Sequence, residues 1–306
     1  MIVIKFCREN FNNLTSGYEM RRENSFIFIK AIFSFFLFLI FTTSIKAQVN
    51  PSSIFSSGMV LQRDHTIPVW GSASANATVK VKLESDSVST QADSIGQWKI
   101  ELSARSAGGP YSMIISSGTQ TLTRTNVYVG DVWLASGQSN MEFALSGSSG
   151  ATSEISAANY QMIRQFKVQK ALANEPSNDL PSGCAWTPAT SQYAGSFTAV
   201  GYYFAKYLKE DLGIPIGILN ISYGGSRIET WMSDAMLGFD EQTVVLGSGE
   251  AERQPTVAFN KMIYPILQFP IKGVIWYQGE SNADNVTEAM EYGDLFKTFI
   301  TGWREL

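Results

Sequence analysis

Three apolar segments in the second half of the chain are each followed at once by a loop rich in Gly, Ser, Asn and Gln. The apolar segments are residues 129–135, 214–221 and 273–277, and the loops are 137–141, 223–226 and 278–282. Segments with helical spacing occupy residues 196–212, 257–267 and 287–303. This alternation predicts an α/β fold, a doubly wound parallel sheet with helices on both faces. Parallel strands end at one edge of the sheet, so we expect the three loops to meet there.

The first half of the chain has a different pattern. Apolar and polar residues alternate in 79–83 and 98–102, and less cleanly in 111–115, and turn-forming residues follow each segment closely. No helical spacing occurs in this part. The pattern predicts a small β-sandwich over residues 48–128, followed by the α/β domain over residues 129–306.

The amino-terminal residues 1–47 have the features of a secretory signal peptide. Residues 31–41 are apolar apart from one serine, basic residues precede them, and Ala47 offers a small residue at the cleavage site. The apolar run is shorter than the ~20 residues needed to span a bilayer. We therefore expect an exported product, periplasmic or extracellular, with no stable membrane insertion after cleavage.

Charge and residue counts exclude several classes of function. A net charge of −4 argues against a nucleic-acid partner, which requires a clustered basic face. The single histidine rules out His-rich zinc sites, and of two cysteines only Cys184 remains after signal cleavage, so no intrachain disulfide can form. The glycine-rich nucleotide-binding motifs are also missing. We expect no metal and no cofactor.

Ser139 stands at the turn that follows the first apolar segment. A serine there has its hydroxyl at the sheet edge and its N–H at the start of the next helix, where negative charge is stabilised. An acyl-transfer nucleophile suits this position because its own N–H can join an oxyanion hole. A serine that only caps the helix suits it equally well, and spacing alone leaves both interpretations open.

The other two loops contain groups that could assist such a nucleophile. Gly224 and Gly225 lack side chains, so their amides can approach a bound ligand closely. Gln278 and Asn282 have side-chain amides that can donate to an oxyanion, and Glu280 can brace the loop. Each of these residues also fits an ordinary turn with internal hydrogen bonds.

The loops together resemble the sialate O-acetylesterase family, carbohydrate esterases of the SGNH-hydrolase superfamily. The similar motifs are residues 138–141, 224–229 and 276–282, and the likeness begins near Gly58 with residues 58–64 and 69–71. The resemblance implies an SGNH-type sheet and a serine esterase that removes O-acetyl groups from sugars such as O-acetylated sialic acid.

The resemblance also implies roles for individual residues. Ser139 would be the nucleophile, and the oxyanion hole would use the N–H groups of Ser139 and Gly225 with the amide of Gln278, or of Asn282 as second choice. Gly224 and Glu280 would support them.

Glu142 would either orient the loop or act as a first-turn acid. Four aromatic residues near the motifs could stack on a sugar but more often belong to a core: Trp133, Trp231, Trp276 and Tyr277.

The family's catalytic base is a histidine in a carboxy-terminal Asp-x-x-His segment, and this chain has no histidine after His65. His65 lies in the β-rich part, at a position that resembles a variable turn of the family. Residues 299–304 resemble a helix that precedes a further strand. We therefore expect an esterase truncated at its carboxyl terminus and inactive, or nearly so, as given. The alternative is a glycan-binding protein that kept the pocket and lost catalysis.

Overall fold

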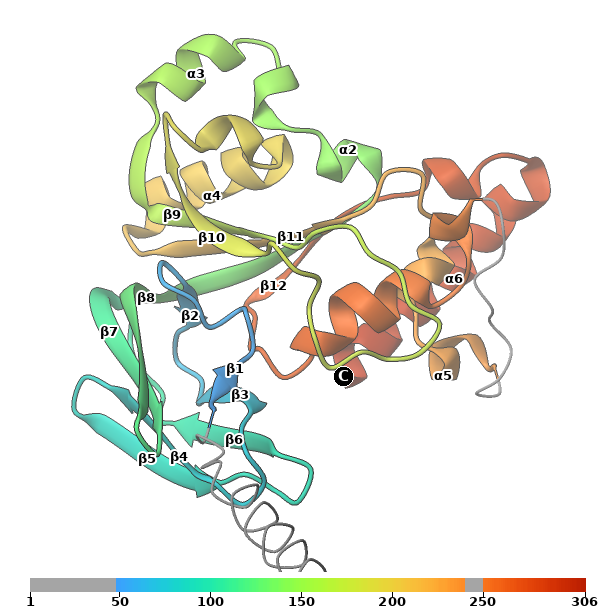
Figure 1. Cartoon of the computed structure of the whole chain (residues 1–306). Coiled ribbons are helices and arrows are strands. Elements are labelled where there is room, and N and C mark those ends of the chain that lie inside the picture. Colours follow the sequence, from blue (N-terminus) through green and yellow to red (C-terminus); the bar gives the residue numbers. More distant parts are fainter. Residues whose placement is uncertain (1–47, 240–249) are drawn as a thin grey trace, which may run out of the picture. The chain divides into compact units, whose positions relative to one another are not determined.

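The computed structural model describes residues 48–239 and 250–306 (Figure 1). The predicted signal peptide 1–47 lies outside the described residues, so it stays a prediction. Within the described part of the chain, no helix is both long enough and apolar enough to cross a bilayer.

The first half of the described chain forms a β-sandwich. One sheet has the order β1 (Asn50–Pro51), β3 (Ile67–Ser72) and β6 (Gln97–Leu102). The other consists of β5 (Asp86–Gln91), β4 (Thr78–Leu83), β7 (Gly108–Ser117), the first part of β8 (Gln120–Gly137), and β2 (Val60–Gln62), which pairs with β8. Buried and exposed residues alternate along β4 and β6, and the buried ones share one core. The strand pattern therefore places one face of each sheet inward.

The long strand β8 belongs to both halves of the protein. Its first part pairs with β7 and β2, and its last part pairs in parallel with β11 (Ile216–Ser222) and β12 (Gly273–Tyr277). The domain boundary predicted between residues 128 and 129 falls inside this strand. The division into two domains stays a prediction.

The second sheet has the order β10 (Ala185–Thr190), β9 (Asn159–Lys167), β11, β8 and β12. Strands β9, β11, β8 and β12 run parallel, whereas β10 is antiparallel to β9. Strands β9, β11, β8 and β12 form the parallel sheet that the sequence predicts, and β10 adds an antiparallel strand beside β9, so the whole sheet is mixed. A parallel neighbour needs a long crossover, usually a helix, and the segment between β9 and β10 contains no helix or strand.

Helices cover both faces of this sheet, as the alternation predicts; Figure 1 shows α4 (Ala199–Leu212) on one side and α6 (Val286–Glu305) on the other. Ile216 and Ile218 of β11 share a core with the α4 side, and Leu219 and Ile221 share one with the α6 side. Helix α4 begins after Thr198, whose side chain accepts from an N–H of the first turn, and stops at Gly213.

Shorter helices complete the fold: α2 (Ser139–Glu142), α3 (Ala151–Ala157) and α5 (Asp234–Leu237). The helix predicted for 257–267 is irregular. It consists of a π-helical turn, Phe259–Ile263, followed by a 3₁₀ turn, Tyr264–Ile266. Pro265 has no N–H to continue a regular ladder, which accounts for the break.

Candidate active site

The three polar loops leave the sheet side by side. In the pairing register, Gly137 of β8 stands opposite Ser222 of β11 and Tyr277 of β12. The N–H of Gln138 donates to the Tyr277 carbonyl at 3.0 Å, and the N–H of Tyr223 donates to the Gly137 carbonyl at 3.0 Å. The loops therefore meet at one edge of the sheet, as the direction of the strands predicts.

Ser139 is exposed at this edge and its hydroxyl is free. The residue in the capping position of α2 is Gln138, with no side-chain cap bond, and the Ser139 hydroxyl has no hydrogen bond within the described residues. The interpretation of Ser139 as a helix cap is therefore not supported. Helix α2 has only 4 residues, however, so its dipole contributes little. Stabilisation of negative charge beside Ser139 therefore depends on individual N–H groups.

The diglycine bend lies directly beside Ser139. A Cβ atom built on Gly224 would stand 3.6 Å from the Ser139 Cβ. The Gly224 N–H donates to Glu142 Oε2 at 2.8 Å, so it is already occupied. The Gly225 N–H has no acceptor among the described residues, at a backbone φ of +83° that favours glycine. Of the two amides, Gly225 is the one available to a ligand.

Glu142 ties the first loop to the second. Its Oε2 accepts from Gly224, and its Oε1 forms an ion pair with Lys170 Nζ at 2.7 Å. The same ammonium lies 5.0 Å from the centre of the Tyr223 ring. Glu142 therefore orients the diglycine bend. Lys170 is absent from the sequence prediction because it comes from a distant, irregular segment.

Gln278 lies in the site with its side chain fully engaged. Its Nε2 donates to the Ser226 carbonyl at 3.1 Å and to Asn282 Oδ1 at 2.8 Å, and its Oε1 accepts from the Tyr292 hydroxyl at 2.9 Å. Burial raises the pKa of Tyr292, which keeps this phenol protonated as a donor. To stabilise an oxyanion, the Gln278 amide would have to give up one of these bonds.

Asn282 is 2% exposed and is also engaged. Its Nδ2 donates to Glu229 Oε2 at 2.9 Å, and its Oδ1 accepts from the Ile228 N–H at 2.9 Å. The oxyanion roles of Gln278 and Asn282 stay predictions. The N–H groups of Ser139 and Gly225 are free of partners within the described residues.

Two further contacts join the first loop to the third. Gln138 Oε1 accepts from the N–H of Gly279 at 3.3 Å and of Ser281 at 3.2 Å, and Glu280 accepts from the side-chain amide of Asn140. Glu280 therefore lies where a bracing residue would lie. Gln138 is a positioning residue that sequence reasoning missed, although it stands within the motif at 138–141 that carried the resemblance.

Most of the aromatic residues near the site belong to the core. Trp231 is 0% exposed, Trp133 packs on Phe204 with ring centres 4.9 Å apart, and Trp276 packs on Phe299 at 4.4 Å. Tyr277 is 46% exposed at the sheet edge. Of the four candidate stacking residues, Tyr277 is the one accessible to a ligand.

No imidazole accompanies Ser139 in the part of the chain that the structure describes. His65 is exposed in the turn between β2 and β3 of the sandwich, where the neighbouring Arg63 N–H bonds to the Gly130 carbonyl at 2.8 Å. From Gly130 to Gly137, β8 extends about 23 Å. The described residues also contain no cluster of His, Cys, Asp and Glu that could hold a metal ion.

The fold and the loops define a class, namely α/β proteins in which three polar loops meet at the carboxyl edge of the sheet. The profile of the family described as carbohydrate esterase, sialic acid-specific acetylesterase, matches residues 129–305. The chain belongs to this family, which confirms the family predicted from its motifs.

Individual relatives agree with the family assignment. Human sialate O-acetylesterase is 33% identical over 282 residues, which cover 83% of this chain and 52% of the human protein. Mouse sialate O-acetylesterase is 31% identical over 302 residues. The crystal structure of a carbohydrate acetylesterase from Xanthomonas citri superposes with a TM-score of 0.80 at 43% identity, over 84% of this chain and 57% of that chain. The chain thus spans about half the length of the curated relatives it matches.

Proposed function

We propose that Ser139 is the nucleophile of a serine esterase that removes O-acetyl groups from sugars such as O-acetylated sialic acid. The observation that supports this most directly is the exposed, unpartnered Ser139 hydroxyl beside the free Gly225 N–H. The relatives named sialate O-acetylesterase and carbohydrate acetylesterase support the choice of an acetylated sugar as substrate.

In the proposed reaction the Ser139 Oγ attacks the acetyl carbonyl carbon, and the hydroxyl proton passes to a base. The N–H groups of Ser139 and Gly225 donate to the oxyanion of the tetrahedral adduct. The bond between the carbonyl carbon and the sugar oxygen then breaks, and that oxygen takes the proton. Water hydrolyses the acetyl-serine ester to acetate and restores the free hydroxyl.

The described residues place no imidazole beside Ser139 to act as the base. Of the carboxylates in the loops, Glu142 accepts a hydrogen bond from Gly224 and Glu280 accepts one from Asn140. We therefore propose that these 306 residues alone turn over slowly or not at all, and that an added base accelerates them.

The experiment measures acetate release from O-acetylated sialic acid by the 306-residue chain, with and without added imidazole as an external base. We expect imidazole to increase the rate of the unchanged chain and Ser139→Ala to abolish this increase, because the nucleophile is then missing. Ser153→Ala, an exposed serine on α3, is the matched control and should leave the rate unchanged. Equal rates for the unchanged chain and Ser139→Ala would contradict the proposal.

A second candidate function, a glycan-binding protein without catalysis, is favoured by the lack of an imidazole near Ser139 in the described residues. It predicts calorimetric binding of acetylated sugars with no acetate release, whether or not imidazole is present. Acetate release that depends on Ser139 would eliminate it.

We propose in addition that the chain is exported and that residues 1–47 are its signal peptide. The amino-terminal sequence of the protein recovered from the periplasm or medium should then begin at Gln48. Recovery of uncleaved chain only from the cytoplasm would contradict export.

A further inference from the structure

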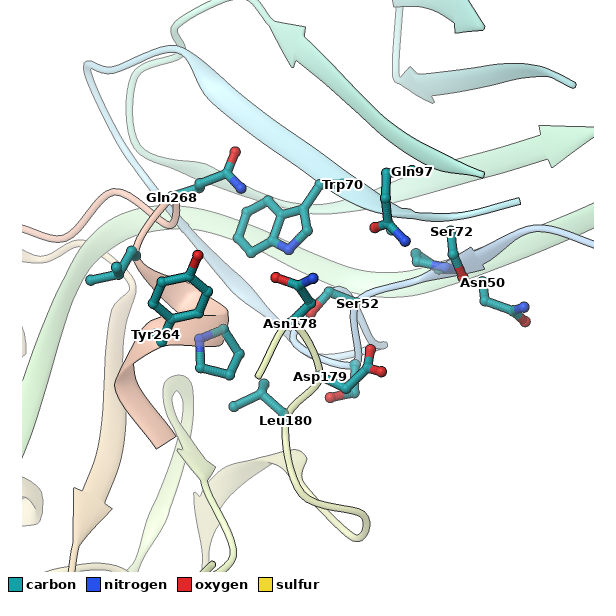
Figure 2. Close-up of a pocket in the computed structure, with 15 residues that line it drawn as sticks. Asn50, Ser52, Trp70, Ser72, Gln97, Asn178, Asp179, Leu180, Tyr264 and Gln268 are labelled. Atoms are coloured by element: carbon teal, nitrogen blue, oxygen red, sulfur yellow. The ribbon is translucent and has the colours of Figure 1, made fainter. Parts of the chain in front are cut away.

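A cavity of about 740 Å³ lies away from the three loops, where the β-sandwich meets residues 178–180 and 264–268 (Figure 2). Strands β1, β3 and β6 form one wall, and the other wall comes from the irregular segment before β10 and from the 3₁₀ turn that begins at Tyr264. None of the residues predicted for the Ser139 site lines it. Its volume is in the range of small-molecule sites in proteins.

Trp70 of β3 supplies a rigid aromatic surface to this cavity. It is 9% exposed, and its ring packs edge-on against Phe55 with centres 4.7 Å apart and against Phe269 at 6.4 Å. Its indole N–H has no acceptor among the described residues. A hydrogen-bond donor held by a fixed ring is therefore available to a ligand.

Tyr264 contributes a second aromatic ring, 37% exposed. Figure 2 shows Tyr264, Trp70 and the side-chain amide of Asn178 along the same cavity. Neither the Tyr264 hydroxyl nor the Asn178 amide has a hydrogen-bond partner within the described part of the chain. Aromatic rings can pack against the C–H face of a sugar ring. Free amides and hydroxyls beside them can form hydrogen bonds with its hydroxyl groups.

The charge of the lining limits the ligand further. Asp179 is the only charged residue among the described residues that line the cavity, and no lysine or arginine lines it. A carboxylate or phosphate on the ligand would be buried without a cation to pair with it, which is unfavourable. The lining therefore suits an uncharged saccharide better than an anionic one.

The cavity wall is held in place before any ligand binds. Lys261 Nζ donates to Ser177 Oγ and to the Asp179 carbonyl, both at 2.9 Å, and Asn260 Nδ2 donates to the Asn174 carbonyl at 2.8 Å. On the opposite wall, the Ser52 N–H donates to the Trp70 carbonyl at 2.9 Å. Binding would need little ordering of the chain, and such preorganisation lowers the free-energy cost of association.

We propose that this cavity is a second carbohydrate-binding site, specific for neutral sugar units and independent of Ser139. Its ligand is a segment of an uncharged oligosaccharide, with a sugar ring against Trp70 and Tyr264 and its hydroxyls bonded to Asn178 and the Trp70 N–H. This inference does not depend on ester cleavage, since no residue of the Ser139 site takes part.

The test is isothermal titration calorimetry of the 306-residue chain with xylotetraose, cellotetraose and mannotetraose, and with sialyllactose as the anionic comparison. We expect at least one neutral tetrasaccharide to bind with a Kd of about 1 mM or tighter. Any binding of sialyllactose should not depend on Tyr264. Tyr264→Ala and Asn178→Ala should each weaken the neutral ligand severalfold or more. Ser139→Ala should leave its binding unchanged.

Tyr193→Ala is the matched control, because Tyr193 is 36% exposed and lies outside the cavity. Hydrogen exchange of residues 173–180 gives a second readout, since a bound sugar should slow it. The proposal is overturned if no neutral tetrasaccharide binds, if Tyr264→Ala weakens the binding of sialyllactose as much as that of the neutral sugar, or if Tyr193→Ala weakens neutral-sugar binding as much as Tyr264→Ala.

Discussion

The two strands that flank β8 at the candidate site hold their loops by different means. All seven residues of β11 are buried, and the strand pairs with β9 and β8 on its two sides. Strand β12 pairs with β8 alone in the described part of the chain, and Val274 is 39% exposed. The diglycine loop therefore follows a strand fixed by packing, whereas the loop at 278–282 depends more on hydrogen bonds from Gln138 and Tyr292.

The side of β12 that does not pair with β8 is also less well covered than either side of β11. A cavity of about 510 Å³ lies along it, lined by Trp276, Phe299 and Trp303 among others. Exposed apolar surface beside an unpaired strand edge promotes association with other chains. The β11 side is therefore expected to be stable and the β12 side to be easier to disturb. Four tests follow, ordered by decreasing size of the expected effect.

The largest effect is expected at Gly137, which stands opposite Tyr277 in the pairing of β8 with β12. Its φ is +138°, and a Cβ there would overlap the carbonyl oxygen of Tyr277. Gly137→Ala must push β12 away, and we expect a loss of about 4 kcal/mol or more in the free energy of unfolding, measured with urea. Gly150→Ala is the control, with a φ of +73° but no atom within 4 Å, and should cost only about 1 kcal/mol. Equal losses would show that β12 is not held against β8.

The second test compares two isoleucines on the two flanks. Ile218 of β11 is 0% exposed, whereas Ile275 of β12 is partly exposed. We expect Ile218→Ala to lower the free energy of unfolding by about 2–5 kcal/mol because it leaves a cavity in a sealed core. Ile275→Ala should cost clearly less, since its site is already open to water. If both cost the same, β12 is covered in solution.

The third test removes one loop brace at a time. Gln138→Ala leaves the N–H groups of Gly279 and Ser281 without their acceptor, which should cost about 1–3 kcal/mol. Hydrogen exchange should accelerate at those two amides and stay unchanged at Gly224. Glu142→Ala should accelerate exchange at Gly224 and leave it unchanged at Gly279 and Ser281. Gln138→Glu should keep those two amides protected because it retains an acceptor. If hydrogen exchange accelerates equally at all three amides in every variant, Gln138 and Glu142 do not hold separate loops.

The smallest effect concerns pH. Hydrogen bonds from Lys206 and from the Tyr202 hydroxyl, each 2.7 Å long, hold the pKa of Glu154 below its ordinary value. Because folding favours the carboxylate, this contribution is present above the ordinary pKa and is lost as the pH falls through the lower, folded pKa.

We expect Glu154→Gln to reduce the stability difference between pH 7 and pH 3 by less than about 1 kcal/mol. The measurement is urea unfolding at both pH values. An unchanged pH dependence would show that this ion pair on the α4 side contributes nothing to stability.

Local patterns predicted the elements that have a strong signal of their own. The apolar run at 273–277 is β12 with the same bounds, and Gly213 ends α4 as its position after the last helical residue indicates. The three loops were found because each follows an apolar strand. In contrast, β9 and β10 were missed, since neither has a clean alternation and their pairing joins residues far apart in the chain.

The sequence by itself determined the fold class, the family and the meeting of three polar loops at one sheet edge, because the alternation of apolar strands with helices and the short motifs are local patterns. Only the tertiary structure decided which polar groups are free. Gln278 and Asn282 are donors by residue type, yet both Gln278 amide hydrogens and one of the two Asn282 amide hydrogens are already bonded, whereas Ser139 and Gly225 keep their N–H groups available. Hydrogen-bond partners come from segments far apart in the chain, and no local pattern records which donors they use.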